Sequence, residues 1–407
     1  MRLRRGVKSL HETQIGVRTK AILEAAKAIR ARKAEILAAN AQDQAAAATK
    51  GITKAMIERL VLNDDRVEAM AKGLEEVAAL PDPVGRELAR WSRPNGLDIA
   101  RVSTPIGVIA IIYESRPNVT ADAAALCIRS ANGAILRSGS EALHSAMAIF
   151  KAIEDGLEAA GLPRTAIQLV PVSDRDAVGL ILGGLDGAVN LIIPRGGKSL
   201  VARVQADARA PVLSHLEGLN HTYVHADADP DKAVAVTLNA KMRRVSVCGA
   251  TETLLIDKAV AHTLLPKIAQ AQTDKGCTLK GDAAAQAIFP MDAATEDDWK
   301  TEYLDTVLSV RVVDDIQAAM EHIKTYGTEH TECIITENAE AAELFLSSVD
   351  SAIVLWNAST QFADGGEFGL GAEIGIATGR MHARGPVGAE QLTTFKYQVR
   401  GNGQVRP

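Results

Sequence analysis

The sequence has few aromatic residues, few cysteines, no long apolar run and no excess of positive charge. Aromatic residues make up 3% of its 407 residues, so any core must be built from aliphatic side chains and alanine. No run approaches the roughly 18 apolar residues that a membrane-spanning helix needs. The net charge of −5 argues against a general nucleic-acid-binding surface.

The few cysteines are too scattered for a disulfide framework or a zinc site, because they form no CxxC pair. They are Cys127, Cys248, Cys277 and Cys333. We therefore expect a reducing, cytoplasmic environment.

A chain that is 47% hydrophobic can form two or three domains at this length. In the first 80 residues or so, apolar residues recur at three- and four-residue spacing, which predicts a layer of helices. The stretch "ELARWSRPNGLDIARVS" predicts a hairpin that turns at Asn95-Gly96. Because the hairpin has little apolar surface of its own, we expect it to pack on a partner chain or another domain.

From residue 105 onward, strand-like and helix-like stretches alternate. "PIGVIAIIYE", "GAILRS", "AIQLVP", "AVNLIIP" and "APVLSHL" predict strands, and so do "ETLLID", "VLSVRVV", "ECIIT" and "SAIVLWN" after Cys248. This alternation predicts two α/β domains with parallel, doubly wound sheets and ligands at the carboxyl ends of the strands. The tail "LTTFKYQVRG" predicts one further strand.

The glycine-rich loop in "IIPRGGKSLV" follows a strand and opens a helix, a setting that favours anion binding. It is not a P-loop, since Ile192 stands where that motif needs the first glycine. No GxGxxG follows a strand either. Phosphate binding and a tight structural turn are equally good interpretations of Gly196-Gly197.

Cys248 lies in the loop "MRRVSVCGA" before a predicted strand, close to Arg243 and Arg244. A thiol near fixed positive charge ionises more easily, and the thiolate is the nucleophilic form. Free cysteines are, however, often plain core residues. Ser246 and Gly249 favour a turn, so the two interpretations are about even from the residues alone.

Histidines are less informative. His215, His221 and His225 cluster in "SHLEGLNHTYVH" without a carboxylate that completes a metal site, so we expect a structural or substrate-facing role. His330 and Arg384 lie in polar turns. Arg384 is suited to a carboxylate or phosphate, although solvated surface is the commoner role for such residues.

Seven stretches together resemble the gamma-glutamyl phosphate reductases, also called glutamate-5-semialdehyde dehydrogenases. They are "PIGVIAIIYESRPNVT", "ILRSGSEA", "IPRGGKSLV", "SHLEGLNHTYV", "NAKMRRVSVCGATETLLI", "YGTEHTECIIT" and "ARGPVGAEQLTTFKYQVRGNG". They run through nearly the whole chain in order. One difference is local: the commoner family motif has proline, glycine and asparagine around the cysteine, where this chain has Val245, Ser246 and Gly249.

The resemblance implies an aldehyde dehydrogenase-like α/β fold, with a Rossmann-type cofactor domain, a second α/β catalytic domain and a small β oligomerisation module. It implies NADPH-dependent reduction of L-glutamyl 5-phosphate to L-glutamate 5-semialdehyde and phosphate, the second step of proline biosynthesis. The cofactor is NADPH/NADP, and no metal is expected.

The resemblance also implies roles for single residues. Cys248 is similar to the family's nucleophile, which forms a thioester, and Asn118 to the donor that stabilises the oxyanion, together with the Cys248 backbone N–H. Arg137 and Ser138 resemble the contacts to the adenosine ribose and 2′-phosphate. The other implied cofactor contacts are Arg195, Gly196, Gly197 and Glu302, and the implied substrate contacts are Arg116, His215, His330 and Arg384.

By the same likeness, the NADP-binding domain covers 1–86 and 105–240, and the catalytic domain covers 241–384. Residues 87–104 and 385–407 form the oligomerisation hairpin and C-terminal strand. The expected partners are the small-molecule substrate, a second copy of the chain in a homo-oligomer and, through a functional link, glutamate 5-kinase. No nucleic acid and no membrane are expected.

Two other classes of function remain open. A hydrolytic aldehyde dehydrogenase needs a glutamate that activates water, and the alignment puts His215, rather than Glu217, at that place. A non-catalytic binding protein on the same scaffold would have little reason to keep Cys248 and the cofactor loops.

Overall fold

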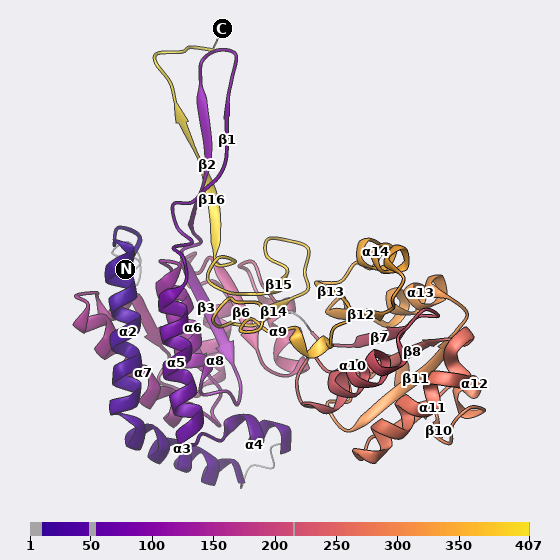
Figure 1. Ribbon diagram of the computed structural model, residues 1–407. Coiled ribbons are helices and arrows are strands. Elements are labelled where there is room, and N and C mark those ends of the chain that lie inside the picture. Colours follow the sequence, from indigo (N-terminus) through magenta and orange to yellow (C-terminus); the bar gives the residue numbers. More distant parts are fainter. Residues whose placement is uncertain (1–9, 49–53, 215, 407) are drawn as a thin grey trace. The chain divides into compact units, whose positions relative to one another are not determined.

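The computed structural model describes residues 10–48, 54–214 and 216–406, and the chain divides into two compact units (Figure 1). The first unit contains the chain up to 214, together with 369–375 and 386–407. The second unit continues from there to 368 and adds 376–385.

The first unit is built on a four-stranded parallel sheet in the order β5-β4-β3-β6. Its strands are β3 (Val108–Tyr113), β4 (Gly133–Ser138), β5 (Ile167–Leu169) and β6 (Leu191–Arg195). Its helices are α2 (Ile15–Ala31), α3 (Lys33–Ala48), α4 (Lys54–Leu60), α5 (Asp64–Ala79), α6 (Val119–Arg129), α7 (Leu143–Ala159), α8 (Arg175–Leu182) and α9 (Lys198–Asp207), with a 3₁₀ turn, η1 (Arg164–Ala166).

Small residues let these helices pack closely. In α6 every residue except Asp122 lies at a buried position of an alanine-rich helix. In α7, a Cβ at Gly156 would lie 2.5 Å from the Ala21 carbonyl oxygen and 2.6 Å from the Ala25 backbone nitrogen of α2. Closely packed, alanine-rich helices therefore take the place of an aromatic core.

The second unit is built on a seven-stranded parallel sheet in the order β10-β9-β11-β8-β7-β12-β13. Its strands are β7 (Asn220–Val224), β8 (Thr251–Asp257), β9 (Thr278–Gly281), β10 (Asp292–Ala293), β11 (Val307–Val313), β12 (Thr331–Ile335) and β13 (Ile353–Trp356). Its helices are α10 (Pro230–Met242), α11 (Lys258–Asp274), α12 (Ala283–Gln286), α13 (Ile316–Tyr326) and α14 (Ala339–Ser348), with 3₁₀ turns η2 (Asp298–Lys300) and η3 (Thr360–Phe362). The remaining short strands, β14 (Ile376–Ala377) and β15 (Gly385–Pro386), form a two-stranded sheet.

Helices cover both faces of this second sheet, as the doubly wound prediction requires. Successive residues of a strand point to opposite faces. Leu254 and Ile256 of β8 accordingly pack in a cluster with α11, whereas Leu255 packs in a cluster with α13 and α14. The predicted fold class, two α/β sheets with an additional small β module, is confirmed.

That additional module is an antiparallel sheet in the order β1-β2-β16, which belongs to the first unit. Its strands are β1 (Glu87–Ser92), β2 (Asp98–Pro105) and β16 (Thr393–Arg400). The hairpin turns where Asn95-Gly96 predicts, and Gly96 has a φ of +85° that glycine adopts without strain. Figure 1 shows β16 lying beside β2 over its length, and the two strands pair from Thr393↔Pro105 to Arg400↔Asp98.

The structure corrects two predictions and adds one strand that sequence reasoning missed. "APVLSHL" is not a strand, since its described part makes only an isolated bridge between Ile192 and Val212. Instead, the strand of this region is β7, which sequence reasoning missed because it begins with the polar residues Asn220 and His221, although all five of its residues are buried. Residues 216–240 belong to the second unit rather than to the cofactor domain, because β7 pairs with β8 and β12.

Among the described residues, no helix is long and apolar enough to cross a membrane.

Candidate active site

Cys248 lies in the loop between α10 and β8, and its side chain is partly exposed. The buried side chain of Asn220 binds the backbone of this loop on both sides of Gly249. The Asn220 amide donates to the carbonyl oxygens of Cys248 and Ala250 at 2.6 and 2.9 Å, and its oxygen accepts the Thr331 backbone N–H at 3.2 Å. Asn220 itself is 0% exposed. Asn220 and Thr331 are the first residues of the neighbouring strands β7 and β12. Hydrogen bonds through Asn220 therefore connect the backbone that carries the thiol to the starts of both strands.

Gly218 lies directly against the cysteine. A Cβ at this position would overlap the Cys248 carbonyl oxygen and lie 3.0 Å from the Cys248 Cα. Only glycine fits here without a shift of backbone. Gly249 is less crowded, since its Cβ would lie 3.1 Å from the Thr360 carbonyl oxygen.

Glu302 reaches the same glycine. Its Oε1 accepts the Gly218 backbone N–H at 3.0 Å. Glu302 and Cys248, which are 54 positions apart in the sequence, thus contact the same residue of a third segment. The structure brings together the predicted nucleophile and one predicted cofactor contact within the second unit.

These groups gather at the amino edge of the sheet, opposite to the carboxyl-end position predicted. Gly218 precedes β7, Cys248 precedes β8 and Glu302 precedes β11. In an alternating α/β unit, helices end where strands begin, and a helix C-terminus carries partial negative charge. α10 ends at Met242, and the exposed Arg243 and Arg244 follow it, so two positive charges lie in the segment that connects the helix to Cys248.

His330 and Arg384 are engaged by other protein groups. His330 is 0% exposed, with Nδ1 2.8 Å from the Thr331 hydroxyl. Arg384 pairs with Glu329 at 2.9 Å and also with Asp350. Arg380 pairs with the same two carboxylates, one of them at 3.4 Å.

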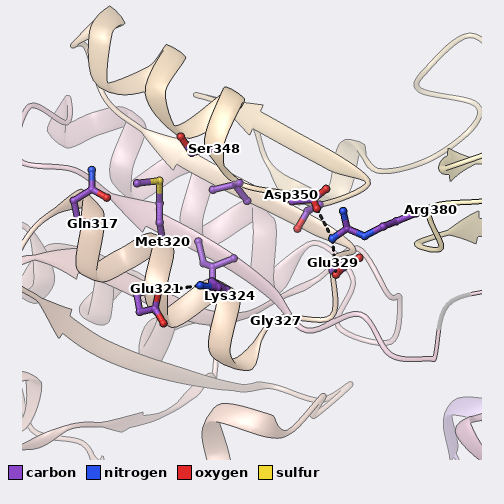
Figure 2. A pocket seen from close by; sticks show the side chains of 12 residues that line it. Gln317, Met320, Glu321, Lys324, Gly327, Glu329, Ser348, Asp350 and Arg380 are labelled. Carbon is purple, nitrogen blue, oxygen red and sulfur yellow. Dashed lines mark hydrogen bonds and ion pairs between the residues drawn. The ribbon is translucent and has the colours of Figure 1, made fainter.

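Part of this ion-pair network borders a cavity of about 480 Å³ beside α13 (Figure 2). In Figure 2, Glu329, Asp350 and Arg380 lie at one end of it and Gln317 and Met320 at the other. His215 lies outside the described residues, so its placement stays a prediction.

The histidine cluster of "SHLEGLNHTYVH" has a structural role where it is described. His221 is 0% exposed, and its Nδ1 lies 2.9 Å from a carboxylate oxygen of Glu332. His225 Nδ1 lies 3.0 Å from the Thr336 hydroxyl. Within residues 10–48, 54–214 and 216–406, no group of three or more His, Cys, Asp or Glu side chains is placed to hold a metal ion.

In the first unit, the predicted cofactor contacts Arg137 and Ser138 end strand β4. Arg137 is 8% exposed and donates to the Ser173 carbonyl oxygen at 3.1 Å. Burial lowers the pKa of Arg137, while Glu141 and Glu114 oppose that shift. Ser138 is buried, and its hydroxyl donates to the Gly139 carbonyl oxygen at 3.1 Å.

Arg137 opens into a cavity of about 430 Å³ at the carboxyl edge of the first sheet. Sequence reasoning missed two further arginines there, Arg175 and Arg203. Arg175 is the first residue of α8, where a cation is unfavourable unless an anion binds nearby, and that signal could have found it. The cavity is lined by Glu114, Arg137, Gly139, Ser140, Glu141, Ser173, Arg175, Val178, Ser199, Leu200 and Arg203.

The glycine loop before α9 binds a carboxyl group of the protein itself, that of Glu114. Glu114, which follows β3, accepts the Gly197 N–H through Oε2 at 3.0 Å. A Cβ at Gly196 would overlap the same oxygen. Burial raises the pKa of Glu114, and Glu141 adds to the rise. Arg195 lies beside the loop, 3.9 Å from Glu373. The helix N-terminus therefore binds a carboxylate, as an anion site would.

Asn118 and Arg116 follow β3 in the same loop. Asn118 directly precedes α6, and its amide donates to Asp122 at 2.9 Å, which leaves a second N–H on that nitrogen. Burial raises the pKa of Asp122 to about 6, against the lowering effect of Asn118. Arg116 is partly exposed.

Three comparisons place the chain among known proteins. The sequence model of the aldehyde dehydrogenase family matches residues 4–286. A protein of Caulobacter sp. (strain K31) named gamma-glutamyl phosphate reductase is 64% identical, covering 99% of this chain and 97% of that protein.

Among solved structures, the gamma-glutamyl phosphate reductase of Thermotoga maritima superposes with a TM-score of 0.95 at 43% identity, covering 100% of this chain and 98% of that chain. A glyceraldehyde-3-phosphate dehydrogenase of Methanocaldococcus jannaschii complexed with NADP superposes with a TM-score of 0.69 at 16% identity, covering 98% and 93% of the two chains. The last likeness shows the fold alone.

Proposed function

The chain belongs to the aldehyde dehydrogenase family and, within it, to the gamma-glutamyl phosphate reductases, and we propose that Cys248 is the nucleophile through which it works. It is an oxidoreductase of proline biosynthesis. It reduces L-glutamyl 5-phosphate to L-glutamate 5-semialdehyde and phosphate, with NADPH as cofactor. The observation that carries the proposal for Cys248 is that Asn220 and Gly218 contact its backbone and that Glu302 binds Gly218.

In the proposed reaction, the Cys248 thiolate attacks the acyl carbon of the substrate. Phosphate leaves with the electron pair of the C–O bond, and a thioester remains on the sulfur. NADPH would supply the hydride that reduces this thioester, after which the C–S bond breaks, the semialdehyde leaves and the Cys248 thiolate is restored. Arg243 and Arg244 favour the thiolate, and the Cys248 backbone N–H and the second amide N–H of Asn118 donate to the oxygen where negative charge develops.

The first unit has the groups that a cofactor with several phosphates needs. A helix N-terminus that binds a carboxylate can bind a diphosphate instead, so we assign the diphosphate to Arg195, Gly196 and Gly197. Arg137 and Ser138 are assigned to the 2′-phosphate side. Arg175 and Arg203 line the same cavity and support that assignment. Glu302 is assigned to the nicotinamide ribose.

The substrate contacts stay as predicted: Arg116, His215, His330 and Arg384. For Arg384 and His330, binding requires a rearrangement, because Arg384 is ion-paired with Glu329 and Asp350 and His330 is fully buried.

Two associations complete the proposal. The β1-β2-β16 sheet exposes Trp91, Phe395 and Tyr397, whose partial exposure of 39%, 45% and 57% suits a homo-oligomer interface. A functional link to glutamate 5-kinase follows from chemistry, since an acyl phosphate hydrolyses readily and benefits from direct transfer. The cytoplasm is the proposed location, because Cys127, Cys277 and Cys333 are buried free thiols and Cys248 must stay reduced.

One assay separates the possible activities. The reverse reaction is run with glutamate 5-semialdehyde and NADP, with and without inorganic phosphate. We expect NADP reduction that depends on phosphate. Reduction without phosphate would indicate a hydrolytic aldehyde dehydrogenase, and no reduction in either case would indicate a binding protein.

A further inference from the structure

The second unit contains a fully buried ion pair close to the Cys248 loop. Lys241, in the last turn of α10, places Nζ 2.6 Å from Oε2 of Glu252 on β8. Their side chains are 0% and 1% exposed. A buried ion pair seldom stabilises a fold more than apolar residues of the same shape would, so stability alone does not account for it.

The other oxygen of Glu252 binds a strained segment. Its Oε1 accepts the Leu304 backbone N–H at 3.2 Å. Leu304 has a φ of +51°, a left-handed conformation that costs about 1–2 kcal/mol for a residue with a side chain. Such a conformation persists only where neighbouring groups impose it.

The residue between Glu302 and Leu304 is also fixed. The Tyr303 hydroxyl lies 2.8 Å from Asp298 and 2.8 Å from the Ser309 hydroxyl. Its ring centroid lies 5.8 Å from Lys241 Nζ and 5.5 Å from Lys280 Nζ. The buried pair thus contacts two consecutive residues of this segment.

From that segment the contacts continue to the cysteine. Glu302 accepts the Gly218 N–H at 3.0 Å, and Gly218 lies against the Cys248 carbonyl group. An unbroken series of contacts therefore runs from the ion pair through residues 302–304 to Cys248.

We propose that Lys241 and Glu252 are positioning residues, which hold residues 302–304 so that the Glu302 carboxylate faces its ligand and the Gly218 turn. The inference rests on the proposed role of Glu302 at the nicotinamide ribose. Lys241 keeps Glu252 available as an acceptor: burial raises the pKa of Glu252 to about 7, and the charge of Lys241 opposes that rise. The essential contact is the hydrogen bond from Leu304 to the oxygen at position 252.

Two double variants separate the hydrogen bond from the charges. Lys241→Met with Glu252→Gln removes the ion pair but keeps an oxygen for the Leu304 N–H. Lys241→Met with Glu252→Leu removes both. For each, the dissociation constants of NADPH and of adenosine 2′,5′-bisphosphate are measured, because the bisphosphate lacks the nicotinamide ribose. Thermal unfolding checks that both variants are folded.

We expect the leucine variant to raise the ratio of the NADPH constant to the bisphosphate constant roughly tenfold, equal to about 1.4 kcal/mol. The glutamine variant should stay within about threefold of wild type. Equal ratios in the two double variants would overturn the inference.

Glu302→Gln serves as the reference variant. If it leaves the ratio unchanged, the role assigned to Glu302 is wrong; if it raises the ratio and the folded leucine variant does not, only the positioning inference is wrong. If the leucine variant does not fold, amide hydrogen exchange in the wild-type protein tests the positioning inference instead. The inference requires that the Leu304 amide hydrogen exchanges as slowly as the amide hydrogens of β8. A rate as fast as that of amide hydrogens in an exposed loop would contradict it.

Discussion

Cys248 is held through its backbone, by Asn220 and Gly218, while its side chain keeps partial access to solvent. The other three cysteines have no such access. Burial raises the pKa of Cys127, that of Cys277 to about 11 and that of Cys333 to about 12. Exposure to solvent therefore distinguishes Cys248, the proposed nucleophile, from the three buried cysteines.

Replacing Cys248 with alanine should abolish turnover and leave NADPH binding intact. Loss of such a nucleophile usually lowers the rate by several orders of magnitude. Residual activity above ~1% would exclude the covalent route. In the wild-type protein, iodoacetamide followed by mass mapping should modify Cys248 first, and earlier modification of Cys127, Cys277 or Cys333 would count against its assignment.

Arg137 should determine the preference for NADPH over NADH. Arg137→Ala removes a charge-assisted contact to the 2′-phosphate and should weaken NADPH binding by ~1–3 kcal/mol, with NADH nearly unchanged. Arg209→Ala, an exposed arginine that does not line the cavity, is the matched control. Equal losses for both cofactors, measured by fluorescence titration, would mean that Arg137 is structural.

Glu114 should make cofactor binding depend on pH. Its carboxylate competes with the cofactor diphosphate for the Gly197 N–H, and burial raises its pKa. Below that pKa the group is neutral and competes less, so NADP affinity should fall as pH rises through the titration of Glu114. Glu114→Gln should bind NADP more tightly at high pH and flatten this dependence. Weaker binding in the variant at every pH would identify Glu114 as a direct ligand contact instead.

At the scale of elements, the Cys248 loop depends on the close approach of the turn before β7. Gly218→Ala would force a Cβ into the Cys248 carbonyl group and should lower kcat/KM at least tenfold. A misplaced thiol that raises the activation free energy by about 1.4 kcal/mol is enough for a tenfold loss. Gly73→Ala in α5 is the control, since a Cβ there meets nothing within 4 Å, and it should stabilise the protein by about 0.4–1 kcal/mol. Full activity in Gly218→Ala would show that the turn does not position the cysteine.

Some elements can be predicted to the residue and others cannot. The stretches "GAILRS" and "VLSVRVV" coincide with β4 and β11, because short stretches rich in aliphatic residues suit strands covered on both faces. β7 escapes this reasoning because Asn220 and His221 are polar, and their burial depends on partners distant in the sequence, Cys248 and Glu332.

The candidate site is predictable only in part for the same reason. Cys248 stands out from its loop composition, and Gly196-Gly197 from its place before a helix. Nothing local to Glu302 or Gly218 indicates that they meet beside Cys248, and nothing local to Glu114 indicates that it occupies the α9 N-terminus. Those contacts join segments that are far apart in the sequence. The segments become neighbours only through the order of the strands in each sheet.

At the scale of the whole molecule, the β1-β2-β16 sheet should mediate self-association. Trp91 and Tyr397 form an edge-to-face pair on it, with ring centroids 6.0 Å apart, and remain partly exposed. Tyr397→Arg should shift the protein to a smaller species in light scattering coupled to gel filtration while NADPH binding is retained. Val405→Arg, 86% exposed in the tail, is the control. An unchanged mass for Tyr397→Arg would mean that association, if present, uses another surface.

The pairing of β2 with β16 also fixes when this sheet can exist during synthesis. β2 leaves the ribosome roughly 290 residues before β16 does, which corresponds to roughly 15–60 s at rates of about 5–20 residues per second. Throughout that interval the nascent hairpin presents an open strand edge, the kind of surface that recruits wrong partners. Only a chain translated through Arg400 can close that edge. A chain that ends before β16 should therefore keep this edge open and, if the proposed self-association uses this sheet, should not join subunits that contain β16.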